Sequence, residues 1–186
     1  MKVVGFSGSP RVHGSTAWAV DEILNGARAQ GAGTEAFSAG KLGIGPCKGC
    51  LGCVNGGGCV VNDGMQSMYD ALKDADALVL GAPIYMGQMS AQSKAFTDRL
   101  FAQITPRFSP RFKEENAGKK LVLVFTQGNP DAGKFRAYVD YTREMFQLLE
   151  FSVQEVIVVA GTRGEAASEQ KGLSARLKSI GEALCR

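Results

Sequence analysis

Lys2-Val-Val-Gly-Phe6 runs directly into Ser7-Gly-Ser-Pro-Arg11, and Val12-His-Gly-Ser-Thr16 follows. The first segment is apolar and has the length of a buried strand, whereas apolar residues recur at helical spacing from Ala17 to Ala27. A strand, a hydroxyl-rich loop and a helix in this order form an anion site, because the first N–H groups of the helix point into the loop. We take this unit as the start of an α/β fold.

The loop provides four hydroxyl groups and one cation that suit a phosphate. These candidate ligands are Ser7, Ser9, Ser15, Thr16 and Arg11. The loop lacks the Gly-Lys-Ser/Thr end of a P-loop and the G-x-G-x-x-G pattern of a dinucleotide site, so a terminal phosphomonoester suits it better than a nucleoside triphosphate. The alternative is an ordinary turn in which Ser15 caps the helix. We expect His13, the only histidine, to be an exposed loop residue.

Five apolar segments alternate with helical patterns along the rest of the chain. The expected strands are 2–6, 34–37, 77–80, 121–125 and 156–160. With right-handed crossovers this order predicts an α/β fold with a doubly wound, five-stranded parallel sheet in the flavodoxin-like strand order 2-1-3-4-5. We expect one domain over residues 1–186. Its hydrophobic fraction of 45% and charged fraction of 21% are typical of soluble globular proteins.

The switch point of this sheet lies between its first and third strands, at their carboxyl ends. These strands carry the Ser-rich loop and the segment Pro83-Ile-Tyr-Met-Gly87. A ligand lying there would have its phosphate on the first loop and a planar ring on the second, where Tyr85 could stack. FMN has this shape. Thr126-Gln-Gly128 follows the fourth strand and adds a third polar loop at the same edge. Without the other motifs, Pro83 to Gly87 would be an ordinary Pro/Gly turn.

Four of the five cysteines lie in one short segment, spaced C-x2-C-x2-C-x5-C. These candidate metal ligands are Cys47, Cys50, Cys53 and Cys59. Gly49 and Gly52 each precede a cysteine and let backbone N–H groups approach the sulfurs. Four cysteines in so compact a run match the ligands of a [4Fe-4S] cluster. Because the loop at 46–60 follows the second strand, we expect it to share the edge of the sheet with the phosphate loop.

Clustered cysteines have other uses in proteins. Disulfides suit small secreted scaffolds, whereas this chain is long and shows no signal peptide. Zinc ribbons usually hold two C-x2-C pairs that are about 15–20 residues apart, a pattern that the compact run fits poorly. Zinc held by four thiolates and unmetallated thiols both stay open. Clustered thiols without an export signal favour the reducing cytoplasm.

Charge and hydropathy exclude two classes of partner. The net charge is only +3, and no basic stretch is interleaved with aromatic residues, so we expect no nucleic acid partner. No apolar run approaches the ~20 residues of a membrane span.

We expect Lys94, Asp98 and Arg99 to form a solvated or subunit-facing stripe. The segment 105–118 is expected to be a surface insertion, with a lid or an oligomer contact as alternatives.

Ser7-Gly-Ser-Pro-Arg11, Gly14-Ser-Thr16 and Gly81-Ala-Pro-Ile-Tyr85-x-Gly87-x-x-Ser90-Ala91 resemble the NADPH-dependent FMN reductase-like group of flavodoxin-fold proteins. The cysteine spacing resembles its iron–sulfur flavoprotein branch. The resemblance implies a [4Fe-4S] cluster on the four cysteines and the FMN phosphate on the first loop. It assigns the isoalloxazine to Pro83, Ile84, Tyr85, Met86 and Gly87, with Thr126, Gln127 and Gly128. It also implies a homodimer or homotetramer in which the cluster of one subunit lies near the FMN of another.

These features predict an FMN-dependent oxidoreductase that carries electrons between a reduced donor such as ferredoxin and a small acceptor, through the cluster and FMN. No Ser–His–Asp or Cys–His constellation is evident, so we assign no catalytic acid or base. One alternative is an NAD(P)H-dependent FMN or quinone reductase. Another is a redox-sensing or zinc-stabilised binding module.

Overall fold

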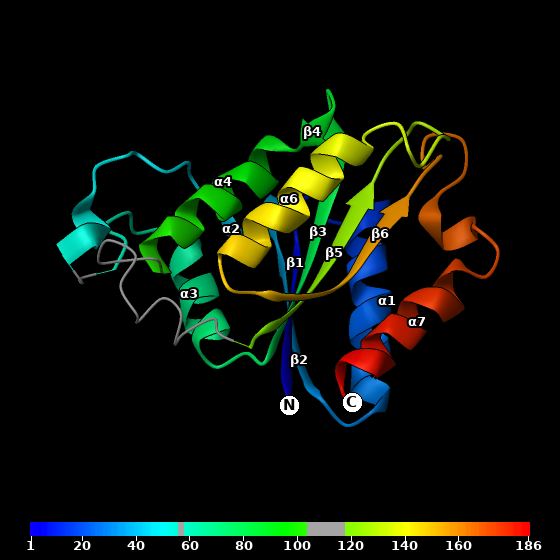
Figure 1. Ribbon diagram of the computed structural model, residues 1–186, viewed down its shortest axis with the longest axis horizontal. Coiled ribbons are helices and arrows are strands. Elements are labelled where there is room, and N and C mark those ends of the chain that lie inside the picture. Colours follow the sequence, from blue (N-terminus) through cyan, green and yellow to red (C-terminus); the bar gives the residue numbers. More distant parts are fainter. Residues whose placement is uncertain (56–57, 104–117) are drawn as a thin grey trace.

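The computed structural model describes residues 1–55, 58–103 and 118–186. Its sheet contains five parallel strands in the order β2-β1-β3-β5-β6, with a short strand β4 paired antiparallel to the end of β3. The strands are β1 (Lys2–Ser7), β2 (Gly33–Ser38), β3 (Ala77–Tyr85), β4 (Gln88–Met89), β5 (Lys120–Thr126) and β6 (Ser152–Val159). The predicted flavodoxin-like strand order is therefore confirmed (Figure 1).

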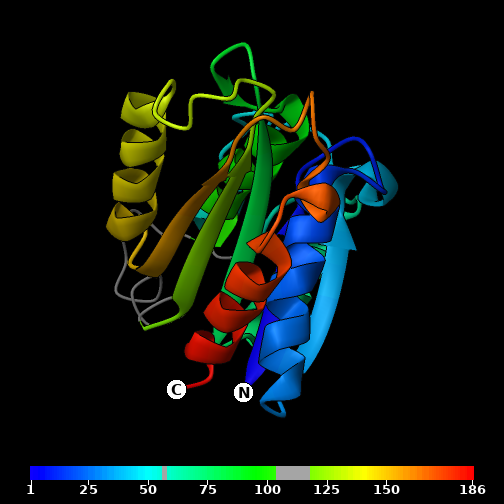
Figure 2. The same cartoon turned by 90° about the vertical axis from the view of Figure 1, so that its right-hand side faces the viewer.

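Helices cover both faces of the sheet. The helices are α1 (Ser15–Ala29), α2 (Ala39–Leu42), α3 (Met65–Lys73), α4 (Ala91–Arg99), α6 (Arg136–Leu148) and α7 (Leu173–Leu184). Short 3-10 turns are η1 (Gly52–Asn55), η2 (Leu100–Gln103) and η3 (Ala167–Glu169). Figure 2 shows α1 and α7 on one side of the sheet and α6 on the other. The core of the α6 side also includes residues of α3 and α4.

Two apolar cores result, one on each face of the sheet. Successive strand residues alternate between them: Val3 and Val79 pack with α1 and α7, whereas Val4 and Leu80 pack with α3, α4 and α6. The inner strands are apolar throughout because both of their faces are covered. On the α4 side, the ring of Phe6 in β1 stacks on that of Phe96, with ring centroids 4.2 Å apart.

The third strand is longer than the sequence indicated. It continues past residue 80 to Tyr85, turns at Met86 and Gly87, and returns as β4. Both turn residues have positive φ, 49° and 83°, which is typical of a two-residue hairpin whose twist matches that of the strands. Pro83 is tolerated in β3 because the neighbouring β1 ends opposite Gly81, where its ladder stops. The predicted loop is therefore a strand end with a hairpin.

Smaller boundaries also differ. The apolar residues between Val139 and Leu149 predict a helix from about Asp131 to Glu150. Helix α6 begins only at Arg136, because the Asp131 carboxylate accepts the Gly133 N–H and holds a turn there. The last strand begins at Ser152 and not at residue 156. Apart from Gly118, the predicted insertion at 105–118 lies outside the described residues. Across the described ranges, no helix is both long and apolar enough to cross a membrane.

Candidate functional site

Three of the predicted cofactor segments meet at the carboxyl ends of neighbouring strands. Ser7, the last residue of β1, lies opposite Gly81 of β3. Farther along β3, Pro83 lies opposite Thr126, the last residue of β5. The parallel register thus confirms that the Ser-rich loop, the β3 end and the loop after β5 open on one edge of the sheet, which we call the rim.

The Ser-rich loop is held to both β3 and α4 by its backbone at Gly8. The Gly8 N–H donates to the Gly81 carbonyl at 2.8 Å. The Gly8 carbonyl accepts from Ser90 Oγ at 2.6 Å and from Ser93 Oγ at 3.2 Å. Ser90 also caps α4, because its Oγ accepts from the Ser93 N–H at 3.1 Å. The start of α4 therefore fixes the position of the loop, a role of Ser93 that the sequence did not reveal.

The loop retains groups that can receive a phosphate. The Ser7 hydroxyl is buried, and it has no hydrogen-bond partner in the described part of the chain. Ser9 is buried and its Oγ accepts from the Arg11 N–H at 3.1 Å, while Arg11 itself is exposed. The N-cap residue of α1 is Gly14, which brings no side-chain acceptor to the first N–H groups of the helix. These residues fit a bound phosphate group.

The two other predicted phosphate ligands have protein partners. Ser15 Oγ accepts from the Ala167 N–H of η3 at 3.3 Å. The alternative that Ser15 caps α1 is wrong, because the N-cap position is occupied by Gly14. Thr16 Oγ1 and Thr126 Oγ1 share a buried hydrogen bond of 2.6 Å, which ties the first turn of α1 to the end of β5. His13 is exposed, as expected.

The predicted ring-binding residues surround the same rim. Tyr85 is 43% exposed and Met86 is fully exposed at the hairpin tip, whereas Pro83 and Ile84 are buried in β3. Gln127 is buried, and its Nε2 donates to the carbonyls of residues 129 and 131. Its Oε1 has no partner among the described residues. An unpaired buried oxygen at the rim fits a ligand with hydrogen-bond donors, as the polar edge of a flavin ring provides.

Two glycines complete this set. Gly87 lies in the hairpin turn, next to the ring of Phe135. Gly128 lies beside Arg163, since a Cβ atom added to Gly128 would be 3.2 Å from the Arg163 Cβ. The loop after β6 therefore also reaches the rim, which the sequence did not indicate.

The cysteine loop does not stay at the rim, so the expectation of a shared edge is corrected. It follows β2 and α2, but it then passes beside the C-terminal end of α4 (Figure 1). The start of α4 adjoins the rim through Ser90, and nine helical residues span about 13 Å. The loop and the rim thus lie at opposite ends of one helix.

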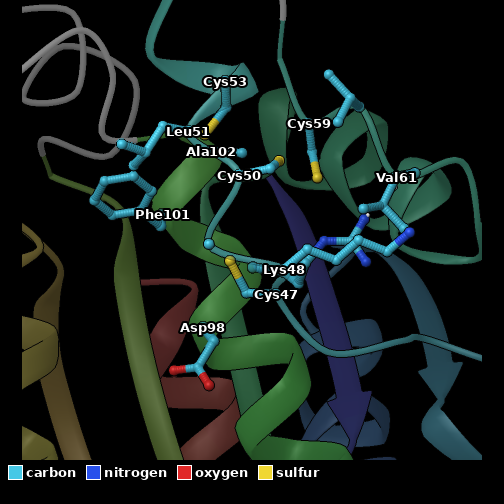
Figure 3. Close-up of a pocket in the computed structure, with 13 residues that line it drawn as sticks. Cys47, Lys48, Cys50, Leu51, Cys53, Cys59, Val61, Asp98, Phe101 and Ala102 are labelled. Atoms are coloured by element: carbon cyan, nitrogen blue, oxygen red, sulfur yellow. Dashed lines mark hydrogen bonds between the residues drawn. The ribbon is translucent and has the colours of Figure 1, made fainter.

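The four cysteines of this loop line one cavity of about 50 Å³. In Figure 3 the sulfur atoms of Cys50 and Cys59 turn toward each other across it, and Cys47 lies on the opposite side from Cys53. Burial raises the pKa of the Cys53 thiol, and the other three cysteines raise it further, because neighbouring negative charge disfavours the thiolate. None of the cysteines forms a disulfide.

The cavity does not have the geometry of a closed metal site. Within the described ranges, no three His, Cys, Asp or Glu side chains are close enough together to hold a metal ion. Four thiols around one space are still the donor set that an iron–sulfur cluster or zinc requires. The predicted metal ligands are therefore brought together as a group, and the cluster remains a prediction.

Arg99 was expected in a solvated or subunit-facing stripe, but it is only 1% exposed and therefore lies inside the subunit. Its guanidinium pairs with both carboxylate oxygens of Asp63, at 2.8 and 3.2 Å. The Asp63 carboxylate also accepts the N–H groups of Gly45 and Met65, each at 2.9 Å. Gln66 Nε2 donates to the carbonyls of residues 59 and 61, at 3.3 and 2.8 Å. These contacts hold the cysteine loop. Lys94 and Asp98 are exposed, as the expected stripe requires, and they form an ion pair with each other.

A groove of about 710 Å³ runs between α4 and α6. It is lined by Cys47 of the cysteine loop and by Gln88 of β4, so it touches both regions. Its apolar lining includes Met89, Phe101, Tyr138, Tyr141, Met145 and Leu149. Tyr141 is 67% exposed, so part of this apolar lining faces solvent.

Solved structures with the same fold include an NADH:FMN oxidoreductase in its apo form, with a TM-score of 0.66 and 20% identity over 99% of this chain and 88% of the other. An archaeal flavodoxin has a TM-score of 0.60 and 13% identity, over 100% and 96% of the two chains. At these identities the similarity establishes the fold alone.

Among curated relatives, an iron–sulfur flavoprotein of Methanocaldococcus jannaschii is 41% identical over 99 residues, which are 53% of this chain and 51% of the relative. One of Methanosarcina thermophila is 35% identical over 99 residues, 53% and 52% of the two chains. An FMN-dependent NADH:quinone oxidoreductase of Methylorubrum extorquens is 32% identical over 111 residues, 55% and 54%. The chain spans about half the length of the curated relatives it matches.

The family model for NADPH-dependent FMN reductase matches residues 1–164, which include the whole rim and the cysteine loop. These matches support an FMN-dependent oxidoreductase. The chain belongs to the NADPH-dependent FMN reductase family, as its resemblance to the iron–sulfur flavoprotein branch led us to expect.

Proposed function

We propose that this protein carries electrons between a reduced donor such as ferredoxin and a small acceptor, through FMN at the rim and a [4Fe-4S] cluster in the cysteine loop. The observation that carries the proposal is the cavity lined by Cys47, Cys50, Cys53 and Cys59 in a chain of an FMN reductase family. The names of the relatives from Methanocaldococcus and Methanosarcina support the same reading.

The residues of the rim divide the work of holding FMN. Ser7, Ser9 and the first N–H groups of α1 would bind the phosphate, with Arg11 at the exposed side. Tyr85 would cover the ring, and Gln127 would accept a hydrogen bond from its polar edge. When bound, FMN exchanges one or two electrons and a [4Fe-4S] cluster exchanges one. No side chain of the rim is needed as an acid or base in this proposal.

The cysteine loop would hold the cluster as thiolates. Metal binding requires deprotonated thiols, so the cluster would displace the proton that the Cys53 thiol, with its raised pKa, otherwise keeps. Cys47 and Cys50 are exposed and form no disulfide, which supports a reducing compartment such as the cytoplasm for the proposed protein.

We also propose that a second copy of the chain covers the groove between α4 and α6. Within one chain, the rim and the cysteine loop are separated by the length of α4. The groove touches both and presents the exposed Tyr141. A second copy there would shield both regions from solvent and bring its own loops near them, as a homodimer or homotetramer.

The test is an anaerobic purification with counts of iron, sulfide, zinc and flavin. We expect about four irons and one FMN per chain. Cys50→Ser should lose the iron and retain the flavin, because the rim does not use this residue. Cys185→Ser is the matched control and should retain both iron and flavin. The Cys185 thiol donates to backbone carbonyls of α1 and α7, far from the cysteine loop. Zinc without iron would contradict the proposal.

A second candidate is an NAD(P)H-dependent FMN or quinone reductase, favoured by the relative from Methylorubrum extorquens. The two candidates differ in the electron donor. Reduced ferredoxin should bleach the flavin in the first case, and NADPH or NADH should do so in the second. Rapid bleaching by a nicotinamide in the Cys50→Ser protein would favour the second candidate.

A further inference from the structure

Outside the rim, Arg99 lies at the junction of α4, α3 and the cysteine loop. We propose that Arg99 is a positioning residue for the cluster: its two terminal nitrogens hold both ends of the cysteine loop, and its Nε–H donates a hydrogen bond to a sulfur in the cavity. The inference rests on the proposed function, because it needs a cluster in that cavity.

The terminal nitrogens of Arg99 donate to both segments that flank the four cysteines. Nη1 donates to the Gly45 carbonyl at 3.2 Å, two residues before Cys47. Nη2 donates to the Val61 carbonyl at 3.1 Å, two residues after Cys59. One planar guanidinium thereby joins the segment that leads into the four cysteines to the segment that leaves them. Lysine has no such fork, so this geometry is specific to arginine.

The orientation of the guanidinium is itself fixed. Its two terminal nitrogens also receive the Asp63 carboxylate, so all four of their N–H groups have partners. The backbone carbonyl of Arg99 accepts from the Tyr69 hydroxyl of α3 at 2.6 Å. The side chain is therefore held from both ends and cannot swing away from the loop without breaking several contacts.

The fifth N–H donor of the Arg99 guanidinium is at Nε. Arg99 Nε is buried and has no hydrogen-bond partner in the described part of the chain. A buried N–H almost always has an acceptor, so its partner is to be sought in a bound group. Arg99 lines the same cavity as the four cysteines, and it is the only arginine among the described residues that do so. A thiolate or a sulfide of a cluster is a suitable anionic acceptor.

Charge at this site supports the assignment. Burial lowers the pKa of Arg99, but Asp63, Tyr69 and Cys59 together raise it above its ordinary value, so the guanidinium stays charged. A cation that donates to a cluster sulfur favours the reduced, more negative cluster. Arg99 should therefore raise the reduction potential of the cluster as well as help to retain it.

The test compares Arg99→Lys, which keeps the charge but removes the fork and the Nε–H, with Arg136→Lys, the same change at an exposed position of α6. Iron and sulfide per chain and the cluster midpoint potential, titrated by electron paramagnetic resonance, are the readouts. Arg99→Lys should lose half or more of its iron and titrate at a lower potential, and Arg136→Lys should match wild type. Equal loading and potential in Arg99→Lys would overturn the inference alone. A wild-type protein without iron would overturn the proposed function as well.

A second measurement needs no variant and decides the matter if Arg99→Lys does not fold. The unmutated holoprotein is prepared with nitrogen-15 arginine, and the reduced cluster is examined by pulsed electron paramagnetic resonance. We expect a hyperfine coupling from an arginine nitrogen. Its absence would mean that water or another group satisfies Nε, and the hydrogen bond to sulfur would be rejected.

Discussion

At Gly8 the Ser-rich loop packs so closely on α4 that no side chain fits. A Cβ atom added there would lie 1.9 Å from Ser93 Oγ and 2.8 Å from its Cβ. Gly8→Ala should therefore shift the loop, lower the free energy of unfolding by about 1–3 kcal/mol and weaken FMN binding by about tenfold or more. Urea unfolding and flavin titration measure the two effects.

Gly164→Ala is the matched control for Gly8→Ala, because its added Cβ would meet nothing closer than the Gly161 carbonyl oxygen at 3.8 Å. Gly164→Ala should leave the free energy of unfolding and the affinity for FMN near their wild-type values. In the Gly8→Ala protein, the further change Ser93→Gly should restore part of the flavin affinity. Unchanged affinity in Gly8→Ala would show that the loop does not hold the cofactor.

Asp63 should make stability depend on pH through its ion pair. Burial raises the pKa of Asp63, but hydrogen bonds from Arg99 and from two backbone N–H groups outweigh it and hold the pKa below its ordinary 3.8. Such a carboxylate stabilises the fold above its unfolded-state pKa and loses that effect as the pH falls through its folded pKa. At about pH 6, Asp63→Asn should lower the free energy of unfolding by roughly 3 kcal/mol, because Arg99 keeps a buried charge without its partner.

The gap between wild type and Asp63→Asn should narrow as the pH falls below 3.8, when the wild-type carboxylate takes up its proton. Urea unfolding of cofactor-free protein at several pH values provides the measurement. Asp98→Asn removes an exposed pair with Lys94 on the same helix and should change stability by less than about 1 kcal/mol at any pH. A constant gap for Asp63→Asn across the range would contradict this account.

At the scale of elements, α4 connects the two candidate cofactor regions. Its first turn holds the Ser-rich loop through Ser90 and Ser93, and its last residue holds the cysteine loop through Arg99. A displacement of the Ser-rich loop can therefore reach the cysteine loop through α4 only if the whole helix moves. The stacking of Phe96 on Phe6 anchors its middle to the sheet.

On the opposite face, α1 and α7 cross closely because each has a glycine at the contact. A Cβ atom added to Gly181 would lie 1.9 Å from the Ile23 carbonyl oxygen, and one added to Gly26 would lie 2.0 Å from that of Lys178. Alanine favours an isolated helix over glycine by about 1 kcal/mol. Gly181→Ala should nevertheless destabilise the protein by about 2–3 kcal/mol, because backbone atoms cannot yield as a side chain can.

Thermal and urea unfolding of Gly181→Ala test this crossing. The control is Ser179→Ala, an exposed position on the same helix whose hydroxyl donates only to the Arg176 carbonyl. Its effect should stay within about 0.5 kcal/mol. If Gly181→Ala proved as stable as wild type, the close approach of α1 and α7 would not contribute to stability as stated.

At the scale of the whole molecule, the groove between α4 and α6 makes assembly testable. Tyr141→Glu places a charge in the apolar groove and should weaken self-association by about tenfold or more. The reason is that a few buried aromatic residues supply most of the binding energy of an interface. Sedimentation velocity over a concentration series measures it. Gln147→Glu adds the same charge on another face of α6 and should leave the assembly unchanged. A wild-type protein that stays monomeric at high concentration would contradict the proposal that a second copy covers the groove.

Much of the fold could be predicted because its signals are local. Apolar runs and helical spacing belong to short segments, and right-handed crossovers then restrict the strand order. The same logic brought the Ser-rich loop, the β3 end and Thr126 to one rim, as the strand register confirms. Strand β3 was cut short at residue 80 because Gly81 and Pro83 are typical of turns, and only the end of β1 beside them lets the strand continue.

The sequence by itself thus determined the strand order, the rim and the grouping of four cysteines, since each depends on spacing along the chain. Tertiary structure alone decided that the cysteine loop leaves the rim and that Arg99 is buried beneath it. The ion pair responsible joins Asp63 to a residue 36 positions away. No local pattern marks which of several charged residues on a helix will find such a partner, and a buried charge is tolerated only where one exists.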